Sequence, residues 1–493
     1  MLPLLLILPL SAAALMPLVS RVRKGLPDIL CPLVLATTLG IALSRIPVMA
    51  SGGIDVWNPT KLGLPLVLSL RMDGLSFLLV TTIGLIAFFA SVFSIHYMRH
   101  YTGRAAYSAL FLLMVTGMYG LVLTTDLFSL YVFLEVAAVA SYSLVAFSQK
   151  HEGVEAAFKY LMLSAPATTG TLLAISFIYL VVGTLDIGML GQAVRTGMEP
   201  GLIALCLAFF LLGFGLKAAL VPFHAWLPDA HPAAPAPISA MLSGVLIKVS
   251  GVYALIRVVY DVLGLPPAAG QALIALGVLS MVVGALVALG QDDFKRMLAY
   301  SSISQIGYIA IGLGVGTPLG ILGALFHLFN HATFKSLLFL DAGATEYATG
   351  TRSLSKLGGI GKKMPITGLT TTIGTFSIAG VPPFNGFWSK FFVILALVEA
   401  HMYWIATLAV ATSILTLAYF LIIQRRAFFG KLAVGLESLR EVPISMTFAT
   451  ISLATLCLVA GLFYPWITDH LIQPGVASLT QAVGTSASML TGP

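Results

Sequence analysis

The sequence predicts an all-α protein that crosses a membrane many times. Of its 493 residues, 58% are hydrophobic and only 9% are charged, whereas soluble domains carry about 25% charged residues. The mean hydropathy is +1.00. Continuous apolar runs of about 20 residues, the length that a membrane helix needs, recur from end to end. A membrane β-barrel would instead require polar and apolar residues to alternate along each strand, so the pattern favours helices.

About 14 apolar runs are long enough to span the bilayer. The first has no basic residue before its apolar core, and a basic cluster follows it, so we expect a retained helix rather than a cleaved signal peptide. In chain order, the predicted spans cover residues 2–20, 28–49, 72–95, 105–125, 127–148, 154–182, 200–221, 233–262, 268–290, 295–316, 319–341, 364–398, 401–428 and 443–465.

The distribution of basic residues predicts the orientation of the chain. The net charge of +7 is concentrated in alternate loops, which the positive-inside rule assigns to the cytoplasm, so both termini are expected outside. This pattern indicates a membrane topology and not a surface for nucleic acid. The cytoplasmic set is Arg21, Arg23, Lys24, Arg99, Arg104, Lys150, Lys295, Arg296, Arg352, Lys356, Lys362, Lys363, Arg425, Arg426, Lys431 and Arg440. The opposite loops hold Arg45, Lys61, Arg71, Arg195 and Arg257.

The three cysteines predict no disulfide and no metal pair. Cys31, Cys206 and Cys457 stand far apart within apolar runs, and none belongs to a CxxC motif. We therefore expect three structural thiols.

Ionisable residues inside the spans are the strongest functional signal. An ionised side chain near the bilayer centre costs at least about 2.5–3.5 kcal/mol, so such residues usually line a polar pathway. Lys217, Lys248 and Lys390 lie mid-span, and Glu135 in "FLEVAA" is interpreted as the only acid embedded as deeply. A carboxylate stabilises a protonated lysine, whereas burial favours proton release, so a Glu–Lys pair can act as a gate. A static ion pair is the alternative.

Three more titratable residues share one helix face. His327, His331 and Lys335 recur every four residues, which aligns them along a helix, and a row of three favours function over packing. Lys159 lies near the start of its span, where snorkelling to the interface and a functional role both remain open.

Two proline interruptions suggest an internal repeat. Lys217 precedes "VPFHAW" and Lys390 follows "VPPFNGFW". Proline breaks a helix, and broken helices in corresponding positions of two halves are typical of transporters. We infer two inverted five-helix units, residues 105–262 and 268–428. The first three helices occupy residues 1–104, and the last helix and tail occupy 429–493.

Other motifs are mostly negative. His224, Asp229 and His231 in "FHAWLPDAH" favour loop capping or proton entry over a metal site, because they share no metal-ligand pattern. "GIGKK" lacks the complete phosphate-binding motif, and no redox-cofactor motif appears. We therefore expect no catalytic residue, no metal and no cofactor in this chain.

Several segments resemble a known family. "LFSLYVFLEVAAVASYSLVAF", "EAAFKYLMLSAP", "LLGFGLKAALVPFHAWLPDAHPAAPAPISAMLSGVLIKVSGVYALIR", "DDFKRMLAYSSISQIGYI", "FHLFNHATFKSLLFLDAG" and "GVPPFNGFWSKF" are similar to the antiporter-like proton-pumping subunits. Respiratory complex I, membrane-bound hydrogenases such as formate hydrogenlyase, and Mrp-type sodium/proton antiporters share this family. The similarity covers about residues 105–400.

The resemblance implies 14 helices, with two inverted five-helix repeats that each form a half-channel around a broken helix. It implies partners as well: other membrane subunits, including homologous ones, and a peripheral redox module whose subunits carry Fe–S clusters. Finally, it implies a proton-translocating series, which comprises the fifth-helix glutamate Glu135, the broken-helix lysine Lys217, the connecting lysine Lys248, the central row His327, His331 and Lys335, and the second half-channel lysine Lys390.

The sequence therefore predicts a proton-translocating subunit of a larger assembly in the cytoplasmic membrane. Protons would enter near Lys217 or the His327 row, cross through Lys248 and Lys335, and leave outward by way of Lys390. An Mrp-type Na⁺/H⁺ antiporter subunit is the main alternative. A stand-alone solute transporter and a membrane enzyme acting on lipid are the weaker ones.

Overall fold

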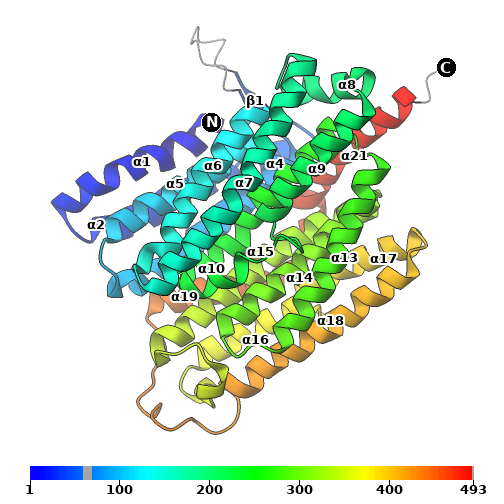
Figure 1. Ribbon diagram of the computed structural model, residues 1–493. Helices are drawn as coiled ribbons and strands as arrows, with labels where there is room; N and C mark the ends of the chain where they lie inside the picture. The colour runs from blue at the N-terminus through cyan, green and yellow to red at the C-terminus, as the bar shows by residue number, and fades with distance from the viewer. Residues whose placement is uncertain (59–68, 491–493) are drawn as a thin grey trace.

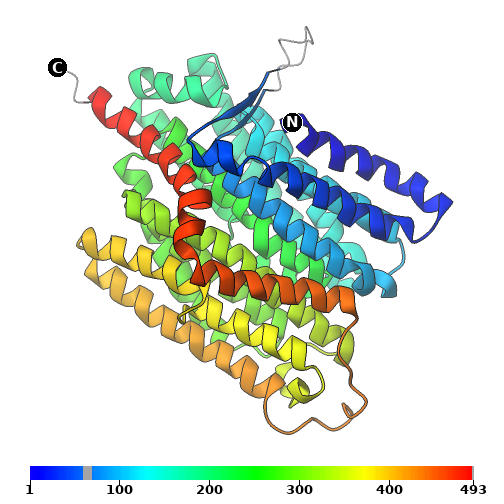
Figure 2. The same cartoon turned by 180° about the vertical axis from the view of Figure 1, so that it is seen from behind.

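The computed structural model describes residues 1–58 and 69–490, and the predicted outer cation Lys61 lies outside this range. The chain forms one bundle of long helices that run nearly side by side (Figures 1 and 2). In both views the start of α1, the β1–β2 hairpin and α8 lie at one end of the bundle, called here the hairpin end. The loop between η8 and α19 lies at the opposite end, called here the loop end.

The first part of the chain contains most of one side of the bundle and a small hairpin that the sequence patterns did not predict. β1 and β2 pair antiparallel, with Asp55 opposite Met72. The elements are α1 (Leu2–Val22), α2 (Leu26–Leu43), α3 (Ile46–Ala50), β1 (Asp55–Trp57), β2 (Leu70–Met72), α4 (Gly74–Tyr97), η2 (Met98–His100), α5 (Arg104–Leu123), α6 (Leu127–Val145), η3 (Ala146–Ser148), α7 (His151–Val182) and α8 (Ile187–Gly197).

The middle of the chain contains the first broken helix and the buried centre of the bundle. Residues 236–262 form one continuous helix in which wide π-type turns alternate with α-helical turns. The elements are α9 (Pro200–Lys217), α10 (Leu227–Ala233), α11 (Ala236–Met241), η4 (Leu242–Tyr253), α12 (Ala254–Ile256), η5 (Arg257–Val262), α13 (Pro267–Leu289), α14 (Phe294–Val315), α15 (Pro318–Thr349), η6 (Leu354–Lys356) and η7 (Ile360–Lys362).

The last part of the chain contains the second broken helix and a helical C-terminal segment. The elements are α16 (Pro365–Ala379), α17 (Asn385–Glu399), α18 (Tyr403–Ile423), η8 (Gln424–Phe428), α19 (Ile444–Leu462), α20 (Tyr464–Ile467), η9 (Thr468–Ile472) and α21 (Gln473–Leu490). The helical segment after Leu462 was not predicted, because its apolar runs are shorter than a membrane span.

Acidic and hydroxyl N-caps fix where several spans begin. Asp73 Oδ1 accepts a hydrogen bond from Ser76 N at 2.9 Å at the start of α4, and Asp126 Oδ1 accepts one from Ser129 N at 2.7 Å at the start of α6. Such a side chain satisfies a backbone donor that has no partner within the helix.

The structure confirms a helical protein that crosses the membrane many times. Within the described residues, 12 helices are long and apolar enough to span a bilayer. Two predicted spans are not among them. The run 319–341 became α15, whose polar side chains lower its hydropathy, and the run 364–398 is divided into α16 and α17.

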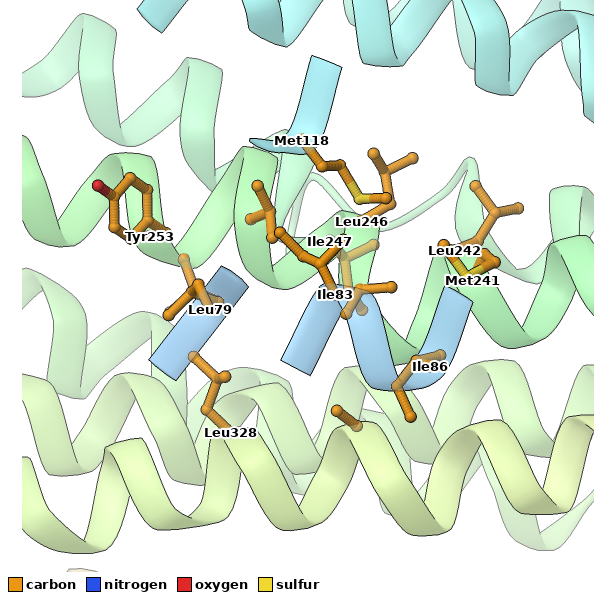
Figure 3. Packing of buried hydrophobic residues seen from close by; sticks show 14 of the residues in the cluster. Leu79, Ile83, Ile86, Met118, Met241, Leu242, Leu246, Ile247, Tyr253 and Leu328 are labelled. Carbon is orange, nitrogen blue, oxygen red and sulfur yellow. The ribbon is translucent and has the colours of Figure 1, made fainter. Parts of the chain in front are cut away.

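The interior of the bundle is built around the helix of residues 236–262, almost all of which are buried. Figure 3 shows Leu79 and Ile83 of α4 lying between Ile247 of η4 and Leu328 of α15. Gly251 brings η4 directly against the end of α9, because a Cβ at this position would lie 2.3 Å from the backbone nitrogen of Ala218. The centre of the membrane domain is therefore closely packed helix on helix.

Candidate functional site

Four lysines, called here the central lysines, lie inside the bundle and face protein rather than lipid. Lys217 ends α9 and is 1% exposed, and Lys248 of η4 is fully buried. Lys335 of α15 is also fully buried, and Lys390 of α17 is 3% exposed. The four residues come from four different elements of the two predicted units.

Neutral oxygens surround the first two amines. Lys217 Nζ donates to the hydroxyl of Tyr142 at 3.1 Å and lies over the rings of Tyr142 and Tyr160. Lys248 Nζ donates to the main-chain oxygen of Ser243. Hydroxyl, carbonyl and ring contacts stabilise an ammonium group less than a carboxylate does.

The second two amines have the same kind of neighbours. Lys335 Nζ donates to Ser301 Oγ of α14. Lys390 Nζ donates to Ile378 O at 2.8 Å and to Ser413 Oγ at 3.2 Å, and it lies 5.0 Å from the ring centre of Tyr308. Across residues 1–58 and 69–490, no carboxylate lies within 4.0 Å of any central lysine. Four buried amines therefore share one interior without counter-ions.

Glu135 does not form the ion pair that was predicted with Lys217. Its carboxylate is half-buried on α6, and Oε1 has no hydrogen-bond partner within the described part of the chain. Tyr142 lies seven residues later on the same helix face and contacts Lys217 instead. Sequence reasoning missed Tyr142, although its spacing from Glu135 was visible. The Lys217 amine therefore contacts the Tyr142 hydroxyl and not the Glu135 carboxylate.

The histidine row is present on one face of α15, as its spacing predicted. The rings of His327 and His331 are 6.2 Å apart and nearly parallel. His327 Nε2 lies 3.1 Å from Gln305 Oε1 of α14, and His327 Nδ1 lies 2.9 Å from Ser389 Oγ of α17. Both histidines are fully buried, and neither nitrogen of His331 has a protein partner in the described ranges. His327, the first residue of the row, thus contacts Ser389, which directly precedes Lys390.

Both predicted interruptions are real breaks whose backbone groups are satisfied by side chains. After Lys217 the chain leaves the helix, and Val221 N donates to Ser280 Oγ of α13 at 2.9 Å. Trp226 Nε1 donates to Leu216 O at 2.9 Å. At the second break the freed carbonyl of Ile378 accepts a hydrogen bond from the Lys390 amine. Freed backbone groups at membrane depth need such partners.

The candidate entry residues separate into a surface group and an interior group. At the loop end, Asp229 pairs with Lys159 at 3.3 Å and with Arg296 at 2.6 Å. His224 is half-buried. His231 is fully buried and stacked 4.5 Å from Phe339, and its ring nitrogens have no protein partner in the described ranges. His231 therefore caps no loop through its ring, which corrects that interpretation, and proton entry stays a prediction.

Two assignments made from the sequence were wrong, and both concern residues at the predicted ends of spans. Glu135 is not the only deeply embedded acid, since Asp341 of α15 is fully buried. Lys295 was counted as a loop charge but is 1% exposed, and its amine pairs with Glu346 at 2.7 Å. This pair borders a polar cavity of about 360 Å³ at the loop end.

Arg257 was also counted as a loop charge, but it is the centre of a buried network at the hairpin end. It donates to both oxygens of Asp73 at 2.7 and 2.8 Å and to Asp261 at 2.8 Å. Burial would raise the pKa of Asp73, but the Arg257 guanidinium outweighs it and lowers the pKa to about 2. These three residues, called here the Arg257 cluster, are paired charges.

Comparisons with known proteins show the family to which the chain belongs. Residues 124–416 match the family model described as NADH:quinone oxidoreductase/Mrp antiporter, transmembrane, and residues 57–108 match that of the N-terminus of complex I chain 5. The chain is 36% identical to NADH-quinone oxidoreductase subunit N of Desulforudis audaxviator, over 85% of this chain and 86% of that one. It is 33% identical to hydrogenase-4 component B of Escherichia coli, over 85% of this chain and 66% of that one.

Solved structures extend the similarity to nearly the whole chain. A chain of the Mrp complex from Dietzia sp. superposes with a TM-score of 0.90 at 28% identity, covering 99% of both chains. A chain of the membrane-bound sulfane sulfur reductase, an archaeal respiratory membrane complex, superposes with a TM-score of 0.88 at 30% identity, again over 99% of both.

Proposed function

The chain belongs to the NADH:quinone oxidoreductase/Mrp antiporter family of membrane subunits, and from that premise we propose that its central lysines carry protons. It is an antiporter-like, proton-translocating subunit of a multisubunit membrane complex. This proposal rests on one observation. Among the described residues, the four buried amines donate hydrogen bonds to neutral oxygens and contact no carboxylate. A buried ammonium without a counter-ion is costly, so each amine can give up its proton as well as hold it.

The route follows the order of the buried groups. Protons enter from the cytoplasm near Lys217 or the His327 row, cross through Lys248 and Lys335, and leave outward at Lys390. Glu135 influences the protonation of Lys217 from the same face of α6 that carries Tyr142. The contacts of His327 with α14 and α17 support the link between the central row and the second break. The surface pair of Lys159 and Asp229, with His224 and His231 behind it, is the proposed entry side.

The proposed architecture is 14 membrane helices in two inverted units, residues 105–262 and 268–428. Residues 1–104 flank them as three helices, and 429–493 as a last helix with a tail. The two breaks, each beside one lysine, support this division. We place both termini outside, since the loop end carries most of the basic loops and the start of α1 lies at the other end.

A redox-driven complex of the cytoplasmic membrane is the proposed setting. The relatives from Desulforudis and Escherichia coli are named as quinone oxidoreductase and hydrogenase components, so the partners would include a peripheral redox module that holds the Fe–S clusters. An Mrp-type Na⁺/H⁺ antiporter is the second candidate, because a chain of the Mrp complex superposes over 99% of this one.

The test is Lys217→Ala in the complete complex in inverted membrane vesicles. We expect proton uptake to fall by roughly 100-fold, the low end of what a positioned proton-transfer group contributes, while the amount of assembled complex stays unchanged. Lys217→Arg tests whether a fixed charge is enough. Wild-type proton uptake in an equal amount of Lys217→Ala complex would refute the role. Replacing sodium by choline in the same vesicles separates the redox-driven and Mrp-type candidates.

A further inference from the structure

Helix α15 carries a second polar face, distinct from the His327 row. Asn330, Thr333, Asp341 and Thr345 recur with spacings of three, eight and four residues, which places them on another side of the helix. All four are 1% exposed or less. Leu337 occupies the gap between Thr333 and Asp341. This face packs against α16, α17 and α19, and the lysine series does not use it.

Asp341 is a buried carboxyl group that lies beside the hydroxyls of Thr370 and Thr371 of α16. Oδ1 accepts a hydrogen bond from Thr370 Oγ1 of α16 at 2.9 Å, whereas Oδ2 has no protein partner in the described ranges. No basic side chain of residues 1–58 or 69–490 lies within 4.0 Å of it. The titratable groups that act on this site are Glu441 and Cys457.

A carboxyl in such surroundings fits the neutral acid better than the anion, because an ionised carboxylate is costly to bury without a cation. A purely structural link between α15 and α16 would not need a carboxyl. Asparagine could accept the same bond from Thr370, and its free amide could donate to the neighbouring carbonyls. What aspartic acid adds at this position is a proton that it can exchange.

Threonine hydroxyl groups lie between Asp341 and the loop end of the bundle. Thr370 lies one turn from Thr367, whose Oγ1 donates to Glu441 Oε1 at 2.6 Å. Glu441 is only half-buried, in the loop before α19. On α15, Thr345 lies one turn from Asp341 towards the same end, and its Oγ1 also has no protein partner within the described chain. The partly exposed carboxylate of Glu441 and the buried one of Asp341 thus each contact a threonine hydroxyl, and the two threonines are one helical turn apart on α16.

Apolar side chains separate Asp341 from the second break, and this packed contact is called here the constriction. The side chains of Leu337 and Leu338 cover Gly374 of α16, where a Cβ would lie 3.4 and 2.9 Å from their methyl groups. Beyond it, Ser377 Oγ and Asn385 Oδ1 have no protein partner among the residues described. These two polar groups lie at the second break, close to Lys390.

We propose that Asp341 is a proton-exchange site on a second branch from the loop end, formed by Glu441, Thr367 and Thr370 and separated from the second break by Leu337. The branch rests on the proposed function, since it supplies the half-channel of Lys390. The Asp341 carboxylic acid gives its proton, by way of the Ser377 hydroxyl, to the neutral amine of Lys390 at the second break. The carboxylate that remains on Asp341 is reprotonated from the Glu441 side. No electron moves in this step.

The first experiment opens the constriction in the complete complex. Leu337→Ser should increase passive proton leak into inverted vesicles several-fold when no driving substrate is present. Adding Asp341→Asn to that variant should return the leak to the wild-type level, because the exchanging carboxyl is gone. No leak in Leu337→Ser, or a leak that persists in the double variant, would overturn the branch.

The second experiment measures driven transport. Asp341→Asn keeps the hydrogen bond from Thr370 and should slow proton uptake by roughly tenfold, while Asp341→Glu restores it. Glu437→Gln, which changes an exposed carboxylate in the same loop as Glu441, is the matched control and should leave uptake unchanged. Wild-type uptake in Asp341→Asn overturns the proposal. Because the leak assay needs no driving reaction, it gives its answer even if Lys217→Ala shows the proposed function to be wrong.

Discussion

The Arg257 cluster and the central lysines are both buried charges, but they are organised in opposite ways. Arg257 binds Asp73 and Asp261 through short, direct hydrogen bonds, so its charge is compensated. The central lysines donate only to hydroxyl and carbonyl oxygens within the described chain. A compensated charge stays fixed and joins helices, whereas an uncompensated amine can change its protonation. We therefore expect the counter-ion, more than burial, to distinguish structural charges from charges that take part in transport.

The largest effect on transport is expected when one of the central lysines, which have no counter-ion, is replaced. Lys248→Met should reduce proton transport by roughly 100-fold without lowering the thermal stability of the complex. Removing a buried amine that has no counter-ion also removes its desolvation cost. The measurements are proton uptake and the thermal unfolding midpoint in detergent. A loss of assembly in Lys248→Met would mean that this lysine is structural after all.

Replacing Arg257, whose charge is paired, should have the opposite effect: it should lower stability and leave transport nearly normal. Arg257→Met leaves Asp73 as a buried carboxylate without its cation, and breaking a buried pair in this manner costs about 3–5 kcal/mol. We expect less assembled complex and a lower unfolding midpoint, with near-normal transport per assembled complex. The double variant with Asp73→Leu, which removes both charges, should recover part of the stability. A transport defect at normal stability would contradict the comparison.

Acid titration sharpens the same contrast. Burial would raise the pKa of Asp73, but Arg257 lowers it to about 2 from its ordinary value of 3.8. The stabilising contribution is therefore complete above pH 3.8 and is lost as the pH falls through about 2. It amounts to about 2 kcal/mol. Thermal unfolding between pH 5 and pH 2 should show this loss in the wild type, and Asp73→Asn should remove that part of the pH dependence.

The smallest effect is expected at an exposed pair. Lys159 binds Glu155 at 2.8 Å and Asp229 at 3.3 Å at the loop end, where solvent and salt screen the charges. Lys159→Gln should change transport by less than about twofold and leave assembly unaltered. Proton uptake at low and high salt is the measurement. A large loss at both salt concentrations would show that proton entry depends on the Lys159 amine itself.

The sequence predicted the fold class and the central lysines for the same physical reason. A charged residue in a long apolar run has to be buried in protein, so Lys217, Lys248 and Lys390 could be identified without a structure. The breaks were visible because proline cannot continue a helix. The spacing of His327, His331 and Lys335 predicted one face, and the structure has it.

The wrong predictions concern residues whose burial or pairing depends on contacts between segments far apart in the chain. Lys295 and Arg257 lie at span ends and look like loop charges, but Glu346 and Asp73 cover them from other helices. Asp341 was placed at the end of a predicted span, whereas α15 continues to Thr349. Glu135 was expected to meet Lys217, yet a tyrosine hydroxyl is the contact. None of these partners is close in sequence.

The hydrogen bond from Val221 N to Ser280 Oγ has a mechanical consequence. Val221 belongs to the break of the first proposed unit, and Ser280 belongs to α13 of the second. The interrupted main chain beside Lys217 is thus hydrogen-bonded to a helix of the other proposed unit. A displacement of α13 would therefore be transmitted through this hydrogen bond to the backbone beside Lys217.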